Sequence, residues 1–359
     1  MKLRQYIEPD FNQENFKNAP DVKLVAAPKD FVAPENYHAM SIFPEYFKID
    51  GKWLFAKESR MDCVAIYKDG EIHVLEFRNI HQGDLVVTGR SEDGHEGIYV
   101  HPNGFKEEKE ENDVFAFRLN RSRETAFSKD YDELYEILRH DREYGKIVWV
   151  LGPAVGFDHD ARAAFSKLIE AGYVDVLLAG NALATHDLEG AYIGTALGQD
   201  IYTQQSMPNG HYNHLDTINR VRYHGDIKTF IEKENIDNGI IYTMEKNNKP
   251  YILCGSIRDD GPLPPVYSDV YQGQEAMRKE IREATTVICI ATMLHSIAVG
   301  NMTPSYRVIN DEVRQIYFYC VDISEFTANK LADRGSLSAK SIITNAQDFV
   351  VNVAKGLDL

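Results

Sequence analysis

Two stretches of sequence, LCGSIRDDGPLPPV (253–266) and VICIATMLHSIAVGNM (287–302), decide the fold class of this chain. Each begins as a short apolar strand and continues into a loop rich in small, polar and charged residues. An apolar strand delivers such a loop to the carboxyl edge of a buried sheet, which is where α/β proteins bind ligands. We therefore expect an active site that uses the polar side chains of these two loops: Arg258, Asp259, Asp260, His295 and Asn301.

The sequence around these stretches repeats a pattern of strand, loop and helix from Lys146 onward. The predicted strands are continuous apolar runs rather than alternating ones, which is typical of strands buried on both faces. Helices between such strands indicate an α/β domain with a parallel sheet. The strands are predicted at KIVWVLG (146–152), VDVLLAG (174–180), PYILCG (250–255), TTVICIA (285–291), IYFYCVD (316–322) and SIIT (341–344).

The first third of the chain has a different pattern. CVAIYKDGEIHVLEF (63–77) contains two alternating runs on either side of Asp69-Gly70, which is a strong signal for a β-hairpin. We therefore divide the chain into an irregular amino-terminal arm (1–45), a small β-rich domain (46–128) and an α/β nucleotide-binding catalytic domain (129–359). An amphipathic helix over 129–144 opens the last of these.

Composition limits the kind of partner. The 359 residues carry a formal net charge of -16, which argues against nucleic acid and anionic membranes as partners. No apolar run approaches the roughly 20 residues of a membrane span, and the amino terminus has no apolar core of signal-peptide length. The four cysteines form no CxxC pair, so neither a disulfide framework nor a cysteine zinc site is expected. These features favour a cytoplasmic protein.

A dinucleotide site needs backbone amides at a helix amino terminus, small residues for close approach and a carboxylate at a strand end. The G-x-G-x-x-G fingerprint is absent. Gly180-Asn181-Ala182 and Val299-Gly300-Asn301 instead offer small residues at predicted strand-to-helix turns. Asp322 ends a predicted strand and suits the ribose hydroxyls, although capping the following helix would also explain it.

The loop SIRDDGPLP (256–264) is suited to an amino-acid substrate. Arg258 can bind a carboxylate through two hydrogen bonds, and Asp259 or Asp260 can hold an ammonium group. The alternative is a loop whose Arg and Asp side chains pair with each other. His295 follows an apolar strand and suits proton transfer, although a buried core histidine would give the same pattern.

Polar residues elsewhere in the α/β half extend this hypothesis. His186 lies at a predicted helix start, from which it can reach a ligand. One of Arg220 and Arg222 is expected to reach a substrate carboxylate. His211, His214 and His224 do not have the i, i+4 spacing of helical metal ligands, so no metal site is predicted.

Several long motifs in the second half resemble, in order, those of the LOR/SDH bifunctional-domain family. This family includes archaeal-type NAD-dependent ornithine cyclodeaminases and the C-terminal module of cyanobacterial arginine dihydrolase/ornithine cyclodeaminase fusions. The matching motifs are LLAGNALATHDLE (177–189), GTALG (194–198), HLDTINRVR (214–222), GSIRDDGPLP (255–264), ATMLHSIAVGNMTP (291–304), CVDI (320–323) and KLADRGS (330–336).

The resemblance implies a deoxyhypusine-synthase-like NAD-binding fold and a lyase of amino-acid metabolism. Such an enzyme converts a diamino acid, ornithine, to proline with release of ammonia, and it uses NAD without net reduction. Under this hypothesis Arg258, Asp259, Asp260 and His295 are catalytic, and a homo-oligomer, either a dimer or a tetramer, is expected. The residues expected to hold NAD are Gly152, Gly180, Asn181, Ala182, Gly300, Asn301 and Asp322.

The chain departs from the family pattern in two places: the first hundred or so residues match poorly, and one turn differs. Family members usually carry a Thr-Gly-Gly-like turn after the first Gly-Pro, whereas Gly152-Pro153 here leads into GFDHDA (156–161). This change alters charge and bulk beside the expected ligand cleft. Two alternatives therefore stay open: an NAD-dependent amino-acid or imine dehydrogenase, and a non-catalytic NAD-sensing protein.

Overall fold

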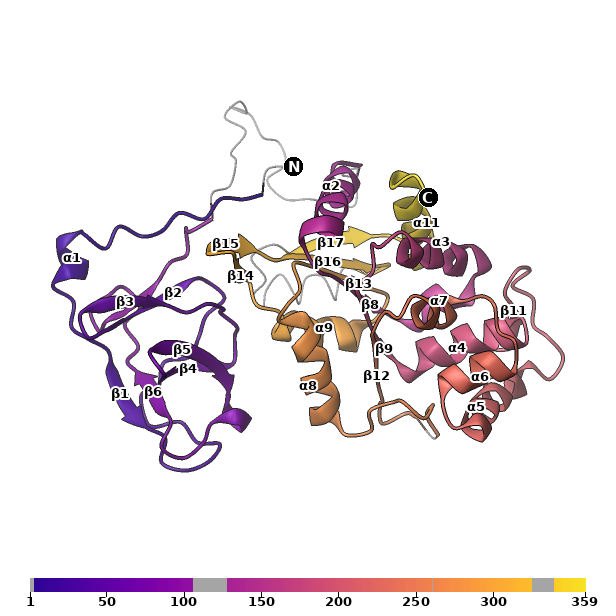
Figure 1. Cartoon of the computed structure of the whole chain (residues 1–359), viewed down its shortest axis with the longest axis horizontal. Coiled ribbons are helices and arrows are strands. Elements are labelled where there is room, and N and C mark those ends of the chain that lie inside the picture. Colours follow the sequence, from indigo (N-terminus) through magenta and orange to yellow (C-terminus); the bar gives the residue numbers. More distant parts are fainter. Residues whose placement is uncertain (1–2, 106–127, 260, 325–338) are drawn as a thin grey trace.

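The carboxyl-terminal two thirds of the chain is built around a parallel sheet (Figure 1). The computed structural model describes residues 3–105, 128–259, 261–324 and 339–359. Within these ranges six strands pair in parallel, which confirms the predicted α/β fold. Their order across the sheet is β12 (Tyr251–Cys254), β9 (Val176–Gly180), β8 (Ile147–Leu151), β13 (Thr286–Ile290), β16 (Tyr317–Asp322) and β17 (Ala339–Ile343).

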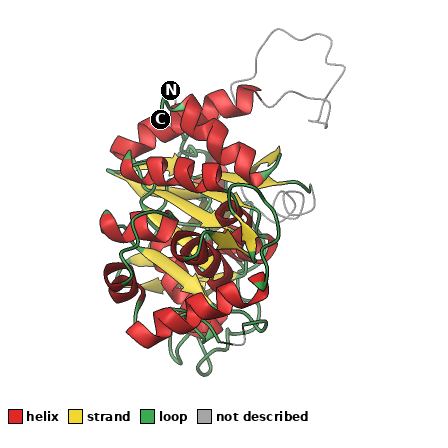
Figure 2. Cartoon of the chain, turned by 90° about the vertical axis from the view of Figure 1, so that its right-hand side faces the viewer, coloured by secondary structure: helices red, strands yellow, loops and turns green. Residues whose placement is uncertain are grey.

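Helices cover both faces of this sheet (Figure 2). Alternate residues of each strand enter two separate cores, which explains why the strands read as continuous apolar runs. Trp149 of β8 packs in the core that includes Phe165 and Phe349, whereas Val150 packs with Met277 and Val299 on the opposite face. The helices are α2 (Ser128–Tyr144), α3 (His159–Glu170), α4 (Asn181–Tyr192), α5 (Asn213–His224), α6 (Ile227–Lys233), α7 (Ile240–Lys246), α8 (Val270–Ile281), α9 (Met293–Met302) and α11 (Ala346–Gly356).

The amino-terminal part consists mostly of antiparallel strands. One sheet has the order β1 (Lys23–Ala26), β6 (Leu85–Thr88), β4 (Cys63–Lys68) and β5 (Glu71–Glu76), and the other has the order β3 (Lys52–Phe55), β2 (Glu45–Ile49) and β7 (Ile98–Val100). The predicted hairpin is confirmed, because β4 pairs with β5 around Asp69 and Gly70, which have φ values of 53° and 84°. Positive φ at both central residues is the requirement of a type I′ turn. Strand β1 pairs with β6, so part of the predicted amino-terminal arm (1–45) belongs to this sheet. The domain boundaries at 45 and 128 stay predictions.

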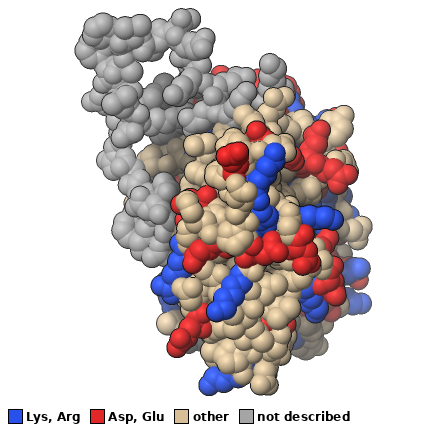
Figure 3. Space-filling view, turned by 90° about the vertical axis from the view of Figure 1, so that its left-hand side faces the viewer, with Lys and Arg blue, Asp and Glu red and all other residues tan. Residues whose placement is uncertain are grey.

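Four smaller strands complete the described structure. The hairpin of β14 (Tyr306–Ile309) and β15 (Glu312–Gln315) contacts the amino-terminal part, where the hydroxyl of Tyr306 donates to the carbonyl oxygen of Ala56 at 2.6 Å. The pair β10 (Thr195–Ala196) and β11 (Gln199–Asp200) lies beside α4, and the helical turn α1 (Glu14–Lys17) precedes β1. The face of the molecule shown in Figure 3 carries acidic and basic side chains interspersed.

Candidate active site

The connections diverge at the carboxyl edge of the sheet between β8 and β13, and we call this position the crevice. The chain leaves β8 toward β9 on one side, and β13 leads to β16 on the other, which is the arrangement that places ligands in α/β folds. Two helices begin at this edge, α4 directly after β9 and α9 two residues after β13. The residues before them, Gly180 and Thr292, make no side-chain capping hydrogen bond among the described residues.

Other helices of the domain are capped by side chains. Asp158 accepts from the backbone of α3, Asp269 from that of α8 and Asn345 from that of α11. The uncapped amino termini of α4 and α9 therefore present free N–H groups and a positive dipole end toward the crevice. This arrangement suits the pyrophosphate of a dinucleotide.

Glycines allow the backbone to come close at this edge. A Cβ on Gly152, directly after β8, would lie 1.9 Å from the carbonyl oxygen of Ala291, directly after β13. A Cβ on Gly180 would lie 3.0 Å from Cε1 of His295. Gly152 thus requires glycine because the obstacle is backbone, whereas a larger residue at Gly180 would need the His295 ring to shift.

Asp322 supplies a carboxylate at the same edge. It ends β16, and its Oδ1 accepts a hydrogen bond from the backbone of Ser324 at 3.0 Å. A strand-terminal carboxylate near uncapped helix termini fits the ribose hydroxyls of a dinucleotide. The donor groups, the small residues and this carboxylate together fit NAD without the standard glycine fingerprint.

A cavity of about 680 Å³ opens beside the start of α4. Of the residues predicted for the site, Asn181, Ala182, Arg258 and Asp259 line it. Residues that the sequence did not assign to the site also line it, and their strand-end or helix-face positions give little local signal. They include Pro153, Phe157, Thr185, Leu197, Leu215, Ile218, Asn219, Ser256 and Gly261.

The loop after β12 is held in place by its own backbone amides. Asp259 accepts from the amide of Ser256 at 2.7 Å, and Asn181 accepts from the amide of Leu263 at 2.9 Å. The loop therefore carries Arg258 and Asp259 to the cavity without an Arg–Asp bridge between these two described residues. Asp260, the third predicted member, lies outside the described residues.

Helix α5 contributes a second cation. Arg222 lines the cavity, and a Cβ on Gly261 would lie 3.2 Å from its Nη1. Arg220 instead pairs with Glu234 at 2.6 Å. Of the two arginines considered from the sequence, Arg222 is the one that lines the cavity.

A buried carboxylate orients His186 in the cavity wall. Nδ1 of His186 lies 2.9 Å from Oε2 of Glu189, one turn along α4. Glu189 also accepts from Thr195 at 2.7 Å and from the amide of Gly198 at 3.1 Å. Burial raises the pKa of Glu189, but the hydrogen bonds from His186, Thr195 and Gly198 outweigh that effect and lower it.

Asp187, between them in sequence, has a structural role. Its carboxylate lies 2.9 Å from Nε of Arg162 and accepts from the amides of Ile240 and Ile241 at 2.9 and 2.8 Å. It thereby caps α7 and neutralises a buried guanidinium. Within NALATHDLE (181–189), His186 therefore lines the cavity, whereas its neighbour Asp187 stabilises the fold.

Two residues predicted to contact the nucleotide do not lie at the kind of turn that the sequence suggested. Gly300 and Asn301 lie in the last turn of α9, so the prediction that they form a strand-to-helix turn is wrong. The run 293–302 is helical because its apolar and small residues continue the helix begun after β13. Gly300 lies seven positions after Met293 in this helix, about 10 Å of axial rise, so Gly300 and Asn301 are far from the amino-terminal donors.

His295 lies at the first turn of α9 against Gly180. Burial lowers the pKa of His295, and the nearby Asp259 carboxylate offsets only part of that effect. Burial therefore favours the neutral form of the ring, which packs against Gly180. Its role as a proton carrier stays a prediction.

The unusual turn after β8 divides its side chains between two tasks. Asp158 accepts from the amide of Ala161 at 2.9 Å and caps α3. Phe157 lines the cavity and packs edge-on against His186, with ring centroids 5.5 Å apart. Phe157, an aromatic residue, is therefore the member of this turn that lines the cavity.

The fold and the crevice define a Rossmann-type domain with a polar cavity for a small charged ligand. The chain belongs to the family described as arginine dihydrolase ArgZ-like, C-terminal: the Rossmann-fold model matches residues 132–353 and the first-region model matches 44–125. No group of three or more His, Cys, Asp or Glu residues is placed to hold a metal within the described ranges. The same ranges contain no helix long and apolar enough to cross a membrane.

Relatives match over most of the chain. It is 40% identical to an ornithine cyclodeaminase of Methanocaldococcus jannaschii, over 94% of this chain and 78% of the relative. It is 41% identical to an ornithine cyclodeaminase of Archaeoglobus fulgidus, over 92% of this chain and 77% of the relative. The motif 330–336, part of the predicted resemblance, lies outside the described residues.

Two solved structures share this fold. A conserved putative LOR/SDH protein from Methanococcus maripaludis S2 matches with a TM-score of 0.85 and 34% identity, over 94% of this chain and 98% of that one. AgrE, named for Nostoc as a bifunctional arginine dihydrolase/ornithine cyclodeaminase, was solved in a ternary complex with ornithine and NAD+. That structure matches with a TM-score of 0.59 and 31% identity, over 95% of this chain and 46% of that one.

Proposed function

We propose that this chain is an NAD-dependent ornithine cyclodeaminase that forms proline and ammonia. The observation that carries the proposal is one cavity lined by two guanidinium groups, Arg222 and Arg258, and by the carboxylate of Asp259. An amino acid offers a carboxylate and an ammonium group, which match these charges. The archaeal relatives named for this activity align with more than nine tenths of the chain, which supports the same conclusion.

Each group has a defined task under this proposal. Arg222 and Arg258 bind the substrate carboxylate, and Asp259, or the neighbouring Asp260, binds an ammonium group. The uncapped amino termini of α4 and α9, with Gly152, Gly180 and Asp322, hold NAD. When bound, NAD supplies reversible oxidation at the carbon that bears the α-amino group.

The decisive test is mass spectrometry of the purified protein incubated with NAD+ and ornithine. The expected result is proline and ammonia in equal amounts, with no net change in absorbance by NADH. Lysine and 2,4-diaminobutyrate serve as matched substrates whose chains are one carbon longer and one carbon shorter. Accumulation of NADH with an oxo or imino acid would contradict the proposal and favour the dehydrogenase.

A non-catalytic NAD sensor predicts a third outcome. Calorimetry would then detect NAD binding, while no diamino acid would be consumed. A homo-oligomer and a cytoplasmic location stay predictions, and light scattering of the full chain measures the first of them.

A further inference from the structure

The least expected feature of the cavity wall is the pairing of His186 with Glu189. Glu189 is fully buried, yet it is surrounded by donors: His186, Thr195 and two backbone amides. A buried carboxylate that accepts from Nδ1 fixes both the tautomer and the orientation of an imidazole. The other ring nitrogen, Nε2, then has a lone pair available and no hydrogen-bond partner among the described residues.

The surroundings place the imidazole of His186 in the wall of the cavity. His186 lines the cavity together with Arg222, Arg258 and Asp259. Phe157 packs against one edge of its ring, and the ring of His214 lies with its centroid 6.1 Å away. The ionisable groups that face His186 are therefore Glu189 on its own helix, His214 and Arg222 on α5, and Arg258 and Asp259 on the loop after β12.

We propose that His186 is a catalytic residue that carries protons to and from the substrate nitrogens, and that Glu189 positions it. This inference rests on the proposed function, because that reaction requires several proton transfers at nitrogen. The sequence alone singled out His295 for this task. His295 instead packs against Gly180, and burial disfavours its protonated form.

One such proton carrier is enough for the proton transfers at the α-nitrogen and the ring nitrogen. Nε2 first accepts a proton from the α-ammonium group, since a carbon bearing an ammonium cannot be oxidised to an imine. The distal ammonium loses its proton to solvent, and the free amine then attacks the imine carbon. The ring C–N bond forms while the π electron pair of the imine moves onto the α-nitrogen. His186 returns its proton to the α-nitrogen and takes one from the ring nitrogen.

The α-nitrogen now leaves as ammonia, because the ring nitrogen supplies the electron pair that forms the cyclic C=N bond. After reduction of that bond, His186 gives its proton to the ring nitrogen and becomes neutral again. Ornithine is thus converted to proline and ammonia, and His186 ends the reaction neutral, as it began. The two electrons removed from the α-carbon return to it on reduction, so the reaction consumes no net oxidant.

The test is a set of matched variants of the full chain. His186→Asn keeps a donor at the Nδ1 position for Glu189 but has no group that can carry a proton. General acid–base catalysis contributes about 10²- to 10⁴-fold, so we expect kcat to fall at least about 100-fold. The KM for ornithine and the affinity for NAD measured by calorimetry should change less than about threefold. His211→Gln, an exposed histidine outside the cavity, is the control and should match the wild type.

The pH profile separates catalysis from structure. We expect the acid limb of kcat/KM to disappear in His186→Asn and to shift to lower pH in Glu189→Gln, because loss of a carboxylate disfavours the imidazolium. A purely structural pair would lower the folded fraction without moving that limb. His186→Gln repeats the test with a different isostere, and thermal melting verifies that each variant is folded.

A measurement without NAD adds an independent readout. Ornithine binding by calorimetry in two buffers with different ionisation enthalpies counts the protons exchanged, and His186→Asn should change that count. The inference is overturned if the wild type converts ornithine while His186→Asn keeps a tenth of its kcat, or if His295→Asn alone removes the acid limb. A wild type that converts no ornithine would instead overturn the proposed function, and this inference with it.

Discussion

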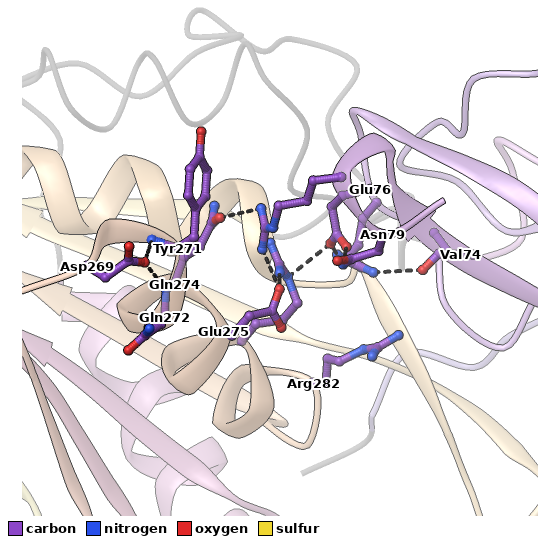
Figure 4. A network of polar contacts seen from close by, with 12 residues as sticks. Val74, Glu76, Asn79, Asp269, Tyr271, Gln272, Gln274, Glu275 and Arg282 are labelled. Atoms are coloured by element: carbon purple, nitrogen blue, oxygen red, sulfur yellow. Dashed lines mark hydrogen bonds and ion pairs between the residues drawn. The ribbon is translucent and has the colours of Figure 1, made fainter. Parts of the chain in front are cut away.

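Oε1 of Glu76 lies 2.9 Å from Nε of Arg278, which pairs the end of β5 with helix α8. Figure 4 shows Glu76 in a network of polar contacts that also includes Gln274 and Glu275 of α8, at the boundary between the amino-terminal strands and the α/β domain. Glu76 also binds Arg60, and Arg78 donates to Gln274 at 2.6 Å. Because α8 directly follows the loop that carries Arg258 and Asp259, these contacts hold the amino-terminal strands against the helix at the end of that loop.

Glu76→Gln tests this boundary. The substitution removes the carboxylate that Arg60 and Arg278 share and leaves each with one remaining partner, Glu58 and Glu275 respectively. We therefore expect a loss of about 1–3 kcal/mol in the free energy of unfolding. Chemical denaturation measures it. Glu71→Gln, on the same strand but with an exposed partner in Lys57, should leave the stability unchanged. Equal effects of the two substitutions would contradict a special role for Glu76.

The same carboxylate sets an acid limit on stability. Burial raises the pKa of Glu76, but Arg60 and Arg278 outweigh it and lower the pKa from 4.5 to about 2. A depressed folded-state pKa stabilises the protein fully above the unfolded value and less as pH falls through the folded value. We therefore expect the stability of the wild type to drop between pH 4.5 and 2 more steeply than that of Glu76→Gln.

Arg222→Met tests the carboxylate clamp. A charge-assisted hydrogen bond contributes about 1.5–3 kcal/mol, so the KM for ornithine should rise by about 10- to 100-fold. The affinity for NAD should not change. The matched control is Arg220→Met, two residues away on α5, whose partner is Glu234. Steady-state kinetics that show equal losses in both variants would refute the assignment.

Gly152→Ala tests the contact between the loops after β8 and β13. The added methyl group would lie 1.9 Å from the carbonyl oxygen of Ala291, so these loops must separate. We expect NAD affinity to fall at least about tenfold, which corresponds to about 1.4 kcal/mol. In Gly156→Ala the nearest atom would be 3.6 Å away, the amide nitrogen of Asp187, and binding should be retained. Calorimetric titration with NAD distinguishes the two.

The turn after β8 yields a prediction that separates stability from specificity. Asp158→Ala removes the cap of α3 and should cost about 1 kcal/mol of stability while the KM for ornithine is retained. Phe157→Ala removes an aromatic side chain from the cavity and should raise that KM with a smaller effect on kcat. If the charge at 158 governs substrate binding, Asp158→Ala will show the larger change in KM.

Prediction from the sequence succeeded where the signal is periodic. The six parallel strands follow from apolar runs such as those ending at Leu151 and Ile290, because burial on both faces demands apolar residues at every position. The β-hairpin at Asp69-Gly70 follows from the φ values that its turn requires. Prediction failed at Gly300 and Asn301, where small residues resemble a turn but continue α9.

The candidate site was less accessible to such reasoning. Arg258 and Asp259 were identified from the composition of their loop, because a short segment held both charges. The choice between Arg220 and Arg222 depends on how α5 is rotated against its neighbours, and sequence spacing does not fix that rotation. Asp187 and His186 are adjacent in sequence, yet one caps α7 and the other faces the cavity.

By itself the sequence determined the parallel sheet, the hairpin and the family, because local periodicity and ordered motifs are properties of the chain alone. Only the tertiary structure decided which polar groups meet. Glu189 binds His186 one turn away, but the cavity they face is completed by Arg222 and Asp259 from distant segments. These contacts depend on how α4, α5 and the loop after β12 pack together. Burial of apolar side chains determines that packing, and proximity in sequence does not.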